Sequence, residues 1–304
     1  MTKFNFIKIL LFSSFIFFCE CNCKIKAVVF DLGGVLCQTD KVAFAKEIFN
    51  AKDIINLGFT SIISSDFAIW NFQERVLSLM SEMEPQICGD NGFIAKYEKS
   101  ELPEIMCKWF RGELSGRNVY KQVKRYFLEQ YIKNPQKFKN KADFNILNRI
   151  IKNMFDQQKL SENTKLISDM LDILKELKKQ NYELFILSNW SKDSFEIFYN
   201  SEHAQEIFEL FKSDHIFVSG ITGFMKPANS AYQNLLGYAF AKYGIQPEEC
   251  VMIDDQPENI EAATKFCGMH GILFDQDFTK FRSELEKFNI LQQQPKGWMQ
   301  YIWS

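Results

Sequence analysis

The amino-acid sequence predicts an α/β protein whose parallel, doubly wound sheet is interrupted by a long helical insertion. Residues 25–30 are apolar, β-branched or aromatic except for Lys26, which is typical of a short buried strand. From about residue 165 onward, apolar runs of strand length alternate with amphipathic helical patterns. This alternation indicates parallel strands joined by helices. We therefore expect one strand of the sheet before the insertion and the others after it.

The elements follow from the spacing of apolar residues. Within the insertion, apolar residues recur every three or four positions, which predicts helices and no strand. These expected helices cover residues 42–49, 65–80, 97–110, 118–132 and 144–155. After the insertion we expect strands at 182–187, 215–218, 251–253 and 271–274, and helices at 165–180, 193–211, 228–243, 257–266 and 278–288.

Composition excludes several classes of function. The chain has 304 residues, a formal net charge of -2 and no dense cluster of basic residues, so nucleic-acid binding is not expected. It has eight cysteines but no pair at CxxC spacing, so a zinc site is not expected either. The sequence provides no basis for predicting an oligomeric state.

The N-terminus has the pattern of a signal peptide. Lys3 and Lys8 precede an apolar run over residues 9–18, which is too short for a membrane span but suits the apolar region of a signal peptide. We therefore expect residues 1–23 to be removed, leaving an exported protein without a stable membrane span. The alternatives are an uncleaved membrane anchor or a buried N-terminal helix of a cytoplasmic protein.

Polar residues stand where the predicted strands end. Asp31 follows the first strand, Ser188 the second, and Asp254 and Asp255 a later one, while Lys226 lies in a loop after another. In a parallel sheet these ends meet at one edge, where ligands bind. A carboxylate can attack phosphorus, hydroxyl and ammonium groups can hold phosphate oxygens, and paired carboxylates favour Mg²⁺. This set of residues suits phosphoryl transfer.

Four segments together resemble the motifs of the haloacid dehalogenase (HAD) superfamily of hydrolases. They occur in the order expected for that family, and the resemblance extends over most of residues 24–288. The segments are Phe-Asp-Leu-Gly-Gly-Val-Leu at 30–36, Leu-Ser-Asn at 187–189, Gly-Phe-Met-Lys-Pro at 223–227 and Met-Ile-Asp-Asp-Gln-Pro-Glu-Asn at 252–259.

The resemblance implies a Rossmann-like HAD core, formed by residues 24–39 and 162–304, with an all-helical cap at 40–161. Residues 109–114, Trp-Phe-Arg-Gly-Glu-Leu, resemble a cap turn of the branch that contains many sugar-phosphate phosphatases. We expect Trp109 or Arg111 to face the site. The alternative is that both are ordinary packing and surface residues.

The family also implies roles for individual residues. Asp31 would be the nucleophile, and Lys226 would offset negative charge on it and on the phosphoryl group. Substrate binding would involve Ser188, with Asn189 beside it, and the backbone of Gly33 and Gly34. The ligands of Mg²⁺ would be Asp31, the Gly33 carbonyl, Asp254 and Asp255.

Gly33 is the departure from the family pattern. Most family phosphatases have a second Asp at this position, which protonates the leaving group and then activates water. The favoured interpretation is a Mg²⁺-dependent phosphatase of a small phosphorylated metabolite that is slow or restricted to good leaving groups. The alternatives are a non-catalytic phosphate-binding protein and a 2-haloacid dehalogenase, against which the retained Asp254 and Asp255 argue.

Overall fold

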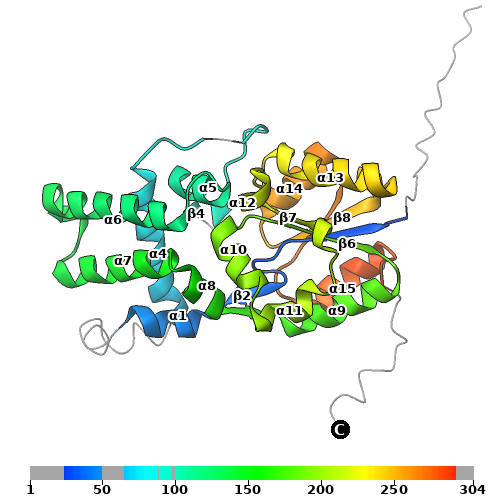
Figure 1. Ribbon diagram of the computed structural model, residues 1–304, viewed down its shortest axis with the longest axis horizontal. Coiled ribbons are helices and arrows are strands. Elements are labelled where there is room, and N and C mark those ends of the chain that lie inside the picture. The colour runs from blue at the N-terminus through cyan, green and yellow to red at the C-terminus, as the bar shows by residue number, and fades with distance from the viewer. Residues whose placement is uncertain (1–23, 50–64, 88, 98–99, 292–304) are drawn as a thin grey trace, which may run out of the picture.

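The computed structural model describes residues 24–49, 65–87, 89–97 and 100–291. The predicted signal segment at 1–23 lies outside these residues. Figure 1 shows two parts side by side: a sheet with helices on both faces, and a group of helices packed against one another. Among the helices in the described ranges, none is long and apolar enough to span a membrane.

A five-stranded sheet organises the first part, with strand order β7-β6-β1-β8-β9. Every neighbouring pair in it is parallel. The central strand is the one before the insertion, as predicted, and each of its residues is buried. The strands are β1 (Ala27–Phe30), β6 (Glu183–Ser188), β7 (Ile216–Val218), β8 (Cys250–Asp254) and β9 (His270–Leu273).

Helices cover both faces of this sheet because the side chains of β1 alternate between the faces. Val28 and Phe30 pack in one apolar cluster, while Ala27 and Val29 pack in another. The first cluster takes in helices α9 (Ser168–Lys179), α10 (Lys192–Tyr199), α11 (Glu202–Phe208) and α15 (Phe278–Lys287). The second takes in α13 (Asn229–Tyr243) and α14 (Pro257–Cys267). This arrangement confirms the predicted Rossmann-like fold.

The helical part has an apolar core of its own, which includes Val123, Phe127 and Ile150. Its helices are α1 (Lys41–Ile48), α4 (Ser65–Ser81), α5 (Glu104–Phe110), α6 (Gly116–Lys133), α7 (Lys141–Met154) and α8 (Gln157–Glu162). Two antiparallel strands, β2 (Cys37–Thr39) and β5 (Thr164–Leu166), connect this part to the sheet domain. The exact domain limits at 40 and 161 stay a prediction.

Four predictions of local structure were wrong. The helix expected at 97–110 begins only at Glu104, because Pro103 disfavours helical backbone in the residue before it. The insertion also contains strands where none was expected, since β3 (Lys96–Tyr97) and β4 (Ser100–Glu101) form a short hairpin before that helix. The helix expected at 165–180 begins at Ser168, since residues 164–166 pair with β2. The helix expected at 193–211 is two helices, α10 and α11.

Candidate active site

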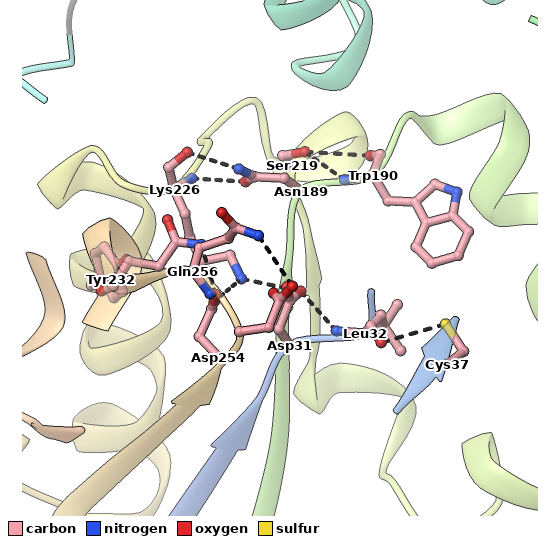
Figure 2. Close-up of polar contacts among 12 residues, drawn as sticks. Asp31, Leu32, Cys37, Asn189, Trp190, Ser219, Lys226, Tyr232, Asp254 and Gln256 are labelled. Atoms are coloured by element: carbon pink, nitrogen blue, oxygen red, sulfur yellow. Dashed lines mark hydrogen bonds and ion pairs between the residues drawn. The ribbon is translucent and has the colours of Figure 1, made fainter. Parts of the chain in front are cut away.

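Four of the predicted site residues, Asp31, Asn189, Lys226 and Asp254, meet at the carboxyl end of the central strands (Figure 2). Asp31 directly follows β1, whose neighbours β6 and β8 end at Ser188 and Asp254. The backbone of Asp31 is fixed by its N–H, which donates to the Ile253 carbonyl at 2.9 Å. Parallel strand ends therefore bring together residues that are more than 200 positions apart, as the sequence predicted.

Lys226 links two of these carboxylates. Its Nζ lies 3.1 Å from Asp31 Oδ1 and 2.5 Å from Asp254 Oδ2. The lysine is only 1 % exposed, so it is a fully buried cation between two anions. Burial alone would lower the pKa of Lys226, but the Asp254 and Asp31 carboxylates together raise it above its usual value. The ammonium therefore stays charged beside Asp31.

Asn189 holds the backbone of Lys226. The Asn189 side-chain amide donates to the Lys226 carbonyl at 2.7 Å, and the Lys226 N–H donates to Asn189 Oδ1 at 2.8 Å. The peptide bond between Lys226 and Pro227 is cis. These two hydrogen bonds position the backbone of Lys226, which the sequence did not predict. The predicted contact between Asn189 and the substrate stays a prediction. Ser188 is buried at the end of β6 and lines the cavity next to it.

Asp254 and Asp255 have different surroundings. Asp254 is fully buried, and its Oδ1 accepts hydrogen bonds from the Gln256 N–H and from Asn259 Nδ2, both at 2.9 Å. Its Oδ2 accepts from Lys226. Burial raises the pKa of Asp254 to about 6, although Lys226 opposes the shift. Both oxygens of Asp254 are therefore already bound by protein donors.

Asp255 is the more open of the two carboxylates. It lines the cavity, and its Oδ2 accepts from Gln256 Nε2 at 3.1 Å. Burial, and then the negative charges of Asp31 and Asp254, raise the pKa of Asp255 to about 7. Oxygens of these three carboxylates lie within 4.8 Å of one another. A hard divalent cation fits such a crowded acidic group, because it would relieve the repulsion.

The two glycines of the first motif have different structural roles. Gly34 has a left-handed backbone with φ of 75°, and an added Cβ would lie 2.6 Å from the Asp255 carboxyl carbon. Only glycine suits this position, because a side chain would displace Asp255. At Gly33 an added Cβ would meet nothing within 4 Å. The backbone there has no need of glycine.

A cavity of about 410 Å³ opens over these residues, between the sheet domain and the helical part. Asp31, Gly33, Ser188, Lys226 and Asp255 all contribute to its wall. Its volume is in the range of small-ligand sites.

A sequence profile of the haloacid dehalogenase-like hydrolases matches residues 25–266. The chain belongs to this family. No curated protein matches it.

Several solved structures are similar to this HAD-like hydrolase at low sequence identity. A HAD family enzyme from Bacteroides thetaiotaomicron, in a magnesium complex, is 14 % identical over 85 % of this chain and 98 % of its own, with a TM-score of 0.49. A predicted HAD-like family hydrolase from Porphyromonas gingivalis is 18 % identical over 89 % of this chain and 99 % of its own, with a TM-score of 0.48. A predicted phosphoglycolate phosphatase from Haemophilus somnus is 16 % identical over 82 % of this chain and 84 % of its own, with a TM-score of 0.38.

Of the two residues expected to face the site from residues 109–114 of this HAD-like hydrolase, only Trp109 is among the described residues that line the cavity. Trp109 lines the cavity, and its Nε1 donates to Asp193 Oδ1 at 3.0 Å. Arg111 is absent from the described lining, and its guanidinium pairs with Glu104 at 2.6 Å and with Glu113 at 2.5 Å. Arg111 therefore anchors the turn itself.

Sequence reasoning gave no role to two further residues of this hydrolase. Asn259 holds Asp254 through the hydrogen bond described above. Asp193, near the start of α10, accepts from the Gly116 N–H at 2.7 Å and from the side chains of Trp109 and Gln157. Asp193 thus ties the helical part to the sheet domain. An Asp in the first turn of a helix usually just interacts favourably with the N-terminal end of that helix, so the position of Asp193 in the sequence did not indicate this role.

Proposed function

We propose that this HAD-like hydrolase is a Mg²⁺-dependent phosphatase of a small phosphorylated metabolite that works through an aspartyl-phosphate. The observation that carries the proposal is the contact of Asp31, at 3.1 Å, with the fully buried ammonium of Lys226 at the wall of a ligand-sized cavity. A structural ion pair would not need a cavity beside it. A nucleophile for an anionic substrate needs both the cavity and the cation.

In this mechanism an oxygen of Asp31 attacks phosphorus, and the bond to the leaving oxygen breaks. Lys226 lowers the repulsion between the carboxylate and the phosphoryl group, and the Ser188 hydroxyl donates to a phosphoryl oxygen. Water then attacks the aspartyl-phosphate, which releases inorganic phosphate and restores Asp31. Because Gly33 carries no side chain, it cannot protonate the leaving oxygen or activate the water.

Mg²⁺ would be held mainly by Asp31 and Asp255, since Asp254 already accepts from three protein donors among the described residues. The Gly33 carbonyl is the third expected ligand. When bound, the cation would supply Lewis-acid stabilisation of the negative charge that gathers on the phosphoryl group. We also propose that residues 1–23 direct export, so that this reaction takes place outside the cytoplasm.

A panel of phosphate esters with and without Mg²⁺, assayed with the wild-type protein and with Asp31→Asn, tests the proposal. We expect turnover that needs both the cation and the Asp31 carboxylate. Hydrolysis of 2-haloacids without metal would contradict it and would indicate a dehalogenase.

A second candidate is a phosphate-binding protein without turnover, which the glycine at position 33 favours. Calorimetry with inorganic phosphate and Mg²⁺ distinguishes the two candidates. Binding of both, together with no hydrolysis of any ester, would support the binding protein over the phosphatase.

A further inference from the structure

The part of the cavity wall that comes from the helical region is largely apolar. It includes Phe44, Leu77, Trp109, Phe110, Met154 and Leu160. The rings of Trp109 and Phe110 stack with their centroids 5.3 Å apart. Flat apolar walls of this kind bind aromatic rings better than they bind hydrated polyols.

Charge on this wall is sparse. Of the described residues that the helical region contributes to the lining, Lys96 is the sole charged one. Its ammonium pairs with Glu258 of α14, which offsets its charge. Uncharged polar groups come from the connecting strands, at Gln38, Thr39 and Thr164, and from the helical region, at Gln73 and Tyr97. The wall therefore suits a neutral, apolar organic group.

The chemistry of the site restricts the leaving group independently. Apart from the proposed site residues, Cys37, Lys96 and Tyr97 are the titratable groups of the described lining. The Cys37 thiol is buried and donates to the Leu32 carbonyl at 3.4 Å. Lys96 is held by Glu258. With glycine at position 33, the first motif supplies no side chain that could protonate the leaving oxygen.

An unprotonated leaving oxygen must depart as an anion, so its basicity controls the rate. An aliphatic alkoxide is about as basic as hydroxide, whose conjugate acid, water, has a pKa of about 15.7. A phenol has a pKa of about 10. A phenolate therefore leaves far more readily than an alkoxide.

We propose that the substrate is a phosphate monoester of an uncharged aromatic alcohol, with the ring against the apolar wall. This inference rests on the proposed phosphatase activity. Asp31 would form the new bond to phosphorus, and the bond between phosphorus and the aryl oxygen would break with its electron pair going to oxygen. The phenolate then takes a proton from solvent, and water cleaves the aspartyl-phosphate to inorganic phosphate.

Binding is measured first, by calorimetry on the full chain carrying Asp31→Asn with Mg²⁺ present. The probes are phenyl phosphate, methyl phosphate and 4-carboxyphenyl phosphate. We expect phenyl phosphate to bind at least about tenfold more tightly than the other two, which corresponds to about 1.4 kcal/mol. Equal affinities for all three would overturn the proposal.

Turnover of the same esters is then compared in two lysine variants. Met154 lines the cavity, whereas Met83 is a half-buried methionine of the helical part outside the described lining. We expect Met154→Lys to shift the ratio of kcat/KM by about tenfold or more from phenyl phosphate toward 4-carboxyphenyl phosphate. Met83→Lys is the matched control and should leave the ratio unchanged.

The outcomes separate the two proposals. Turnover of methyl or sugar phosphates as fast as phenyl phosphate, if it needs Asp31, would overturn the aryl specificity and leave the phosphatase standing. No turnover of any ester, with phenyl phosphate still bound preferentially by the Asp31→Asn protein, would overturn the phosphatase and leave the aryl phosphate as the ligand. Loss of both preferential binding and turnover would overturn both.

Discussion

Replacing Gly33 with Asp should restore the proton donor that the first motif lacks. An added Cβ at this position meets nothing within 4 Å, and the backbone is outside the left-handed region, so the substitution introduces no strain. Gly33 also lines the same cavity as Asp31 and Lys226. A carboxylic acid placed here would lie beside the substrate.

The size of the effect follows from general acid catalysis. A positioned acid or base contributes about 10²–10⁴-fold in rate, which is roughly 3–5 kcal/mol of barrier lowering. We expect Gly33→Asp to raise kcat on methyl phosphate by about 100-fold or more. On aryl phosphates with activated leaving groups the increase should be much smaller, because those phenolates depart without a proton.

The assay is kcat against leaving-group pKa for substituted phenyl phosphates and methyl phosphate. A proton donor should flatten this dependence in Gly33→Asp. Gly33→Asn is the matched control, since it has nearly the same shape without an ionisable proton. If Gly33→Asp is no faster than Gly33→Asn on methyl phosphate, the missing acid is not what limits the wild-type protein, and the reasoning about Gly33 is wrong.

Three further predictions concern the support of the site and the fold. Asn189→Ala leaves the buried Lys226 peptide without its hydrogen-bond partners. Steady-state kinetics should therefore show kcat falling by a larger factor than KM rises, and chemical denaturation should show a loss of about 1–3 kcal/mol of stability. Gly34→Ala should weaken Mg²⁺ binding in calorimetry, since the methyl group would displace Asp255, and its left-handed backbone should cost about 1–2 kcal/mol. Burial lowers the pKa of His215 below 6.5, so the neutral imidazole contributes stability above pH 6.5, and this contribution to Tm should be lost as the pH drops through the lowered pKa.

Each of these has a matched control. Asn189→Asp keeps the acceptor for the Lys226 N–H and should lose less activity than Asn189→Ala. Gly223 also has a left-handed backbone, with φ of 79° but no atom near an added Cβ, so Gly223→Ala should leave Mg²⁺ binding intact. His215→Gln removes this contribution, so the difference in Tm between the wild-type protein and His215→Gln should shrink as the pH drops below 6.5; a difference that is constant across this range would contradict the assignment.

The sheet was predictable because its signal is local. Each buried strand is a short apolar run that ends in a polar residue, and parallel topology then places all these ends together. The strands β2 and β5 gave no such signal. They are three residues each, and Gln38, Thr39 and Lys165 are polar. They form strands because they pair with each other across more than 120 positions, which no local pattern reveals.

The sequence predicted that the candidate site residues would lie together, but it did not predict their contacts. Ser188 and Asn189 are neighbours in sequence and both line the cavity, yet only the Asn189 side chain is recorded as binding the Lys226 peptide. The character of the cavity wall also depends on packing. Trp109 and Arg111 stand in the same turn, and the fold places only Trp109 among the described lining residues.

The consecutive acids Asp254 and Asp255 illustrate why spacing in the sequence alone does not identify which carboxylates could bind a metal ion. Adjacent residues at a strand end point to opposite sides, so an Asp-Asp pair does not present two equivalent ligands to one ion. Asp254 is fully buried and accepts from Lys226, Gln256 and Asn259, which leaves Asp255 to face the cavity. Lys226 is in turn shared by Asp254 and Asp31. In the proposed mechanism, Asp254 thus fixes the Lys226 ammonium beside Asp31, and Asp255 is left to bind Mg²⁺, so loss of either carboxylate should impair the site for a different reason.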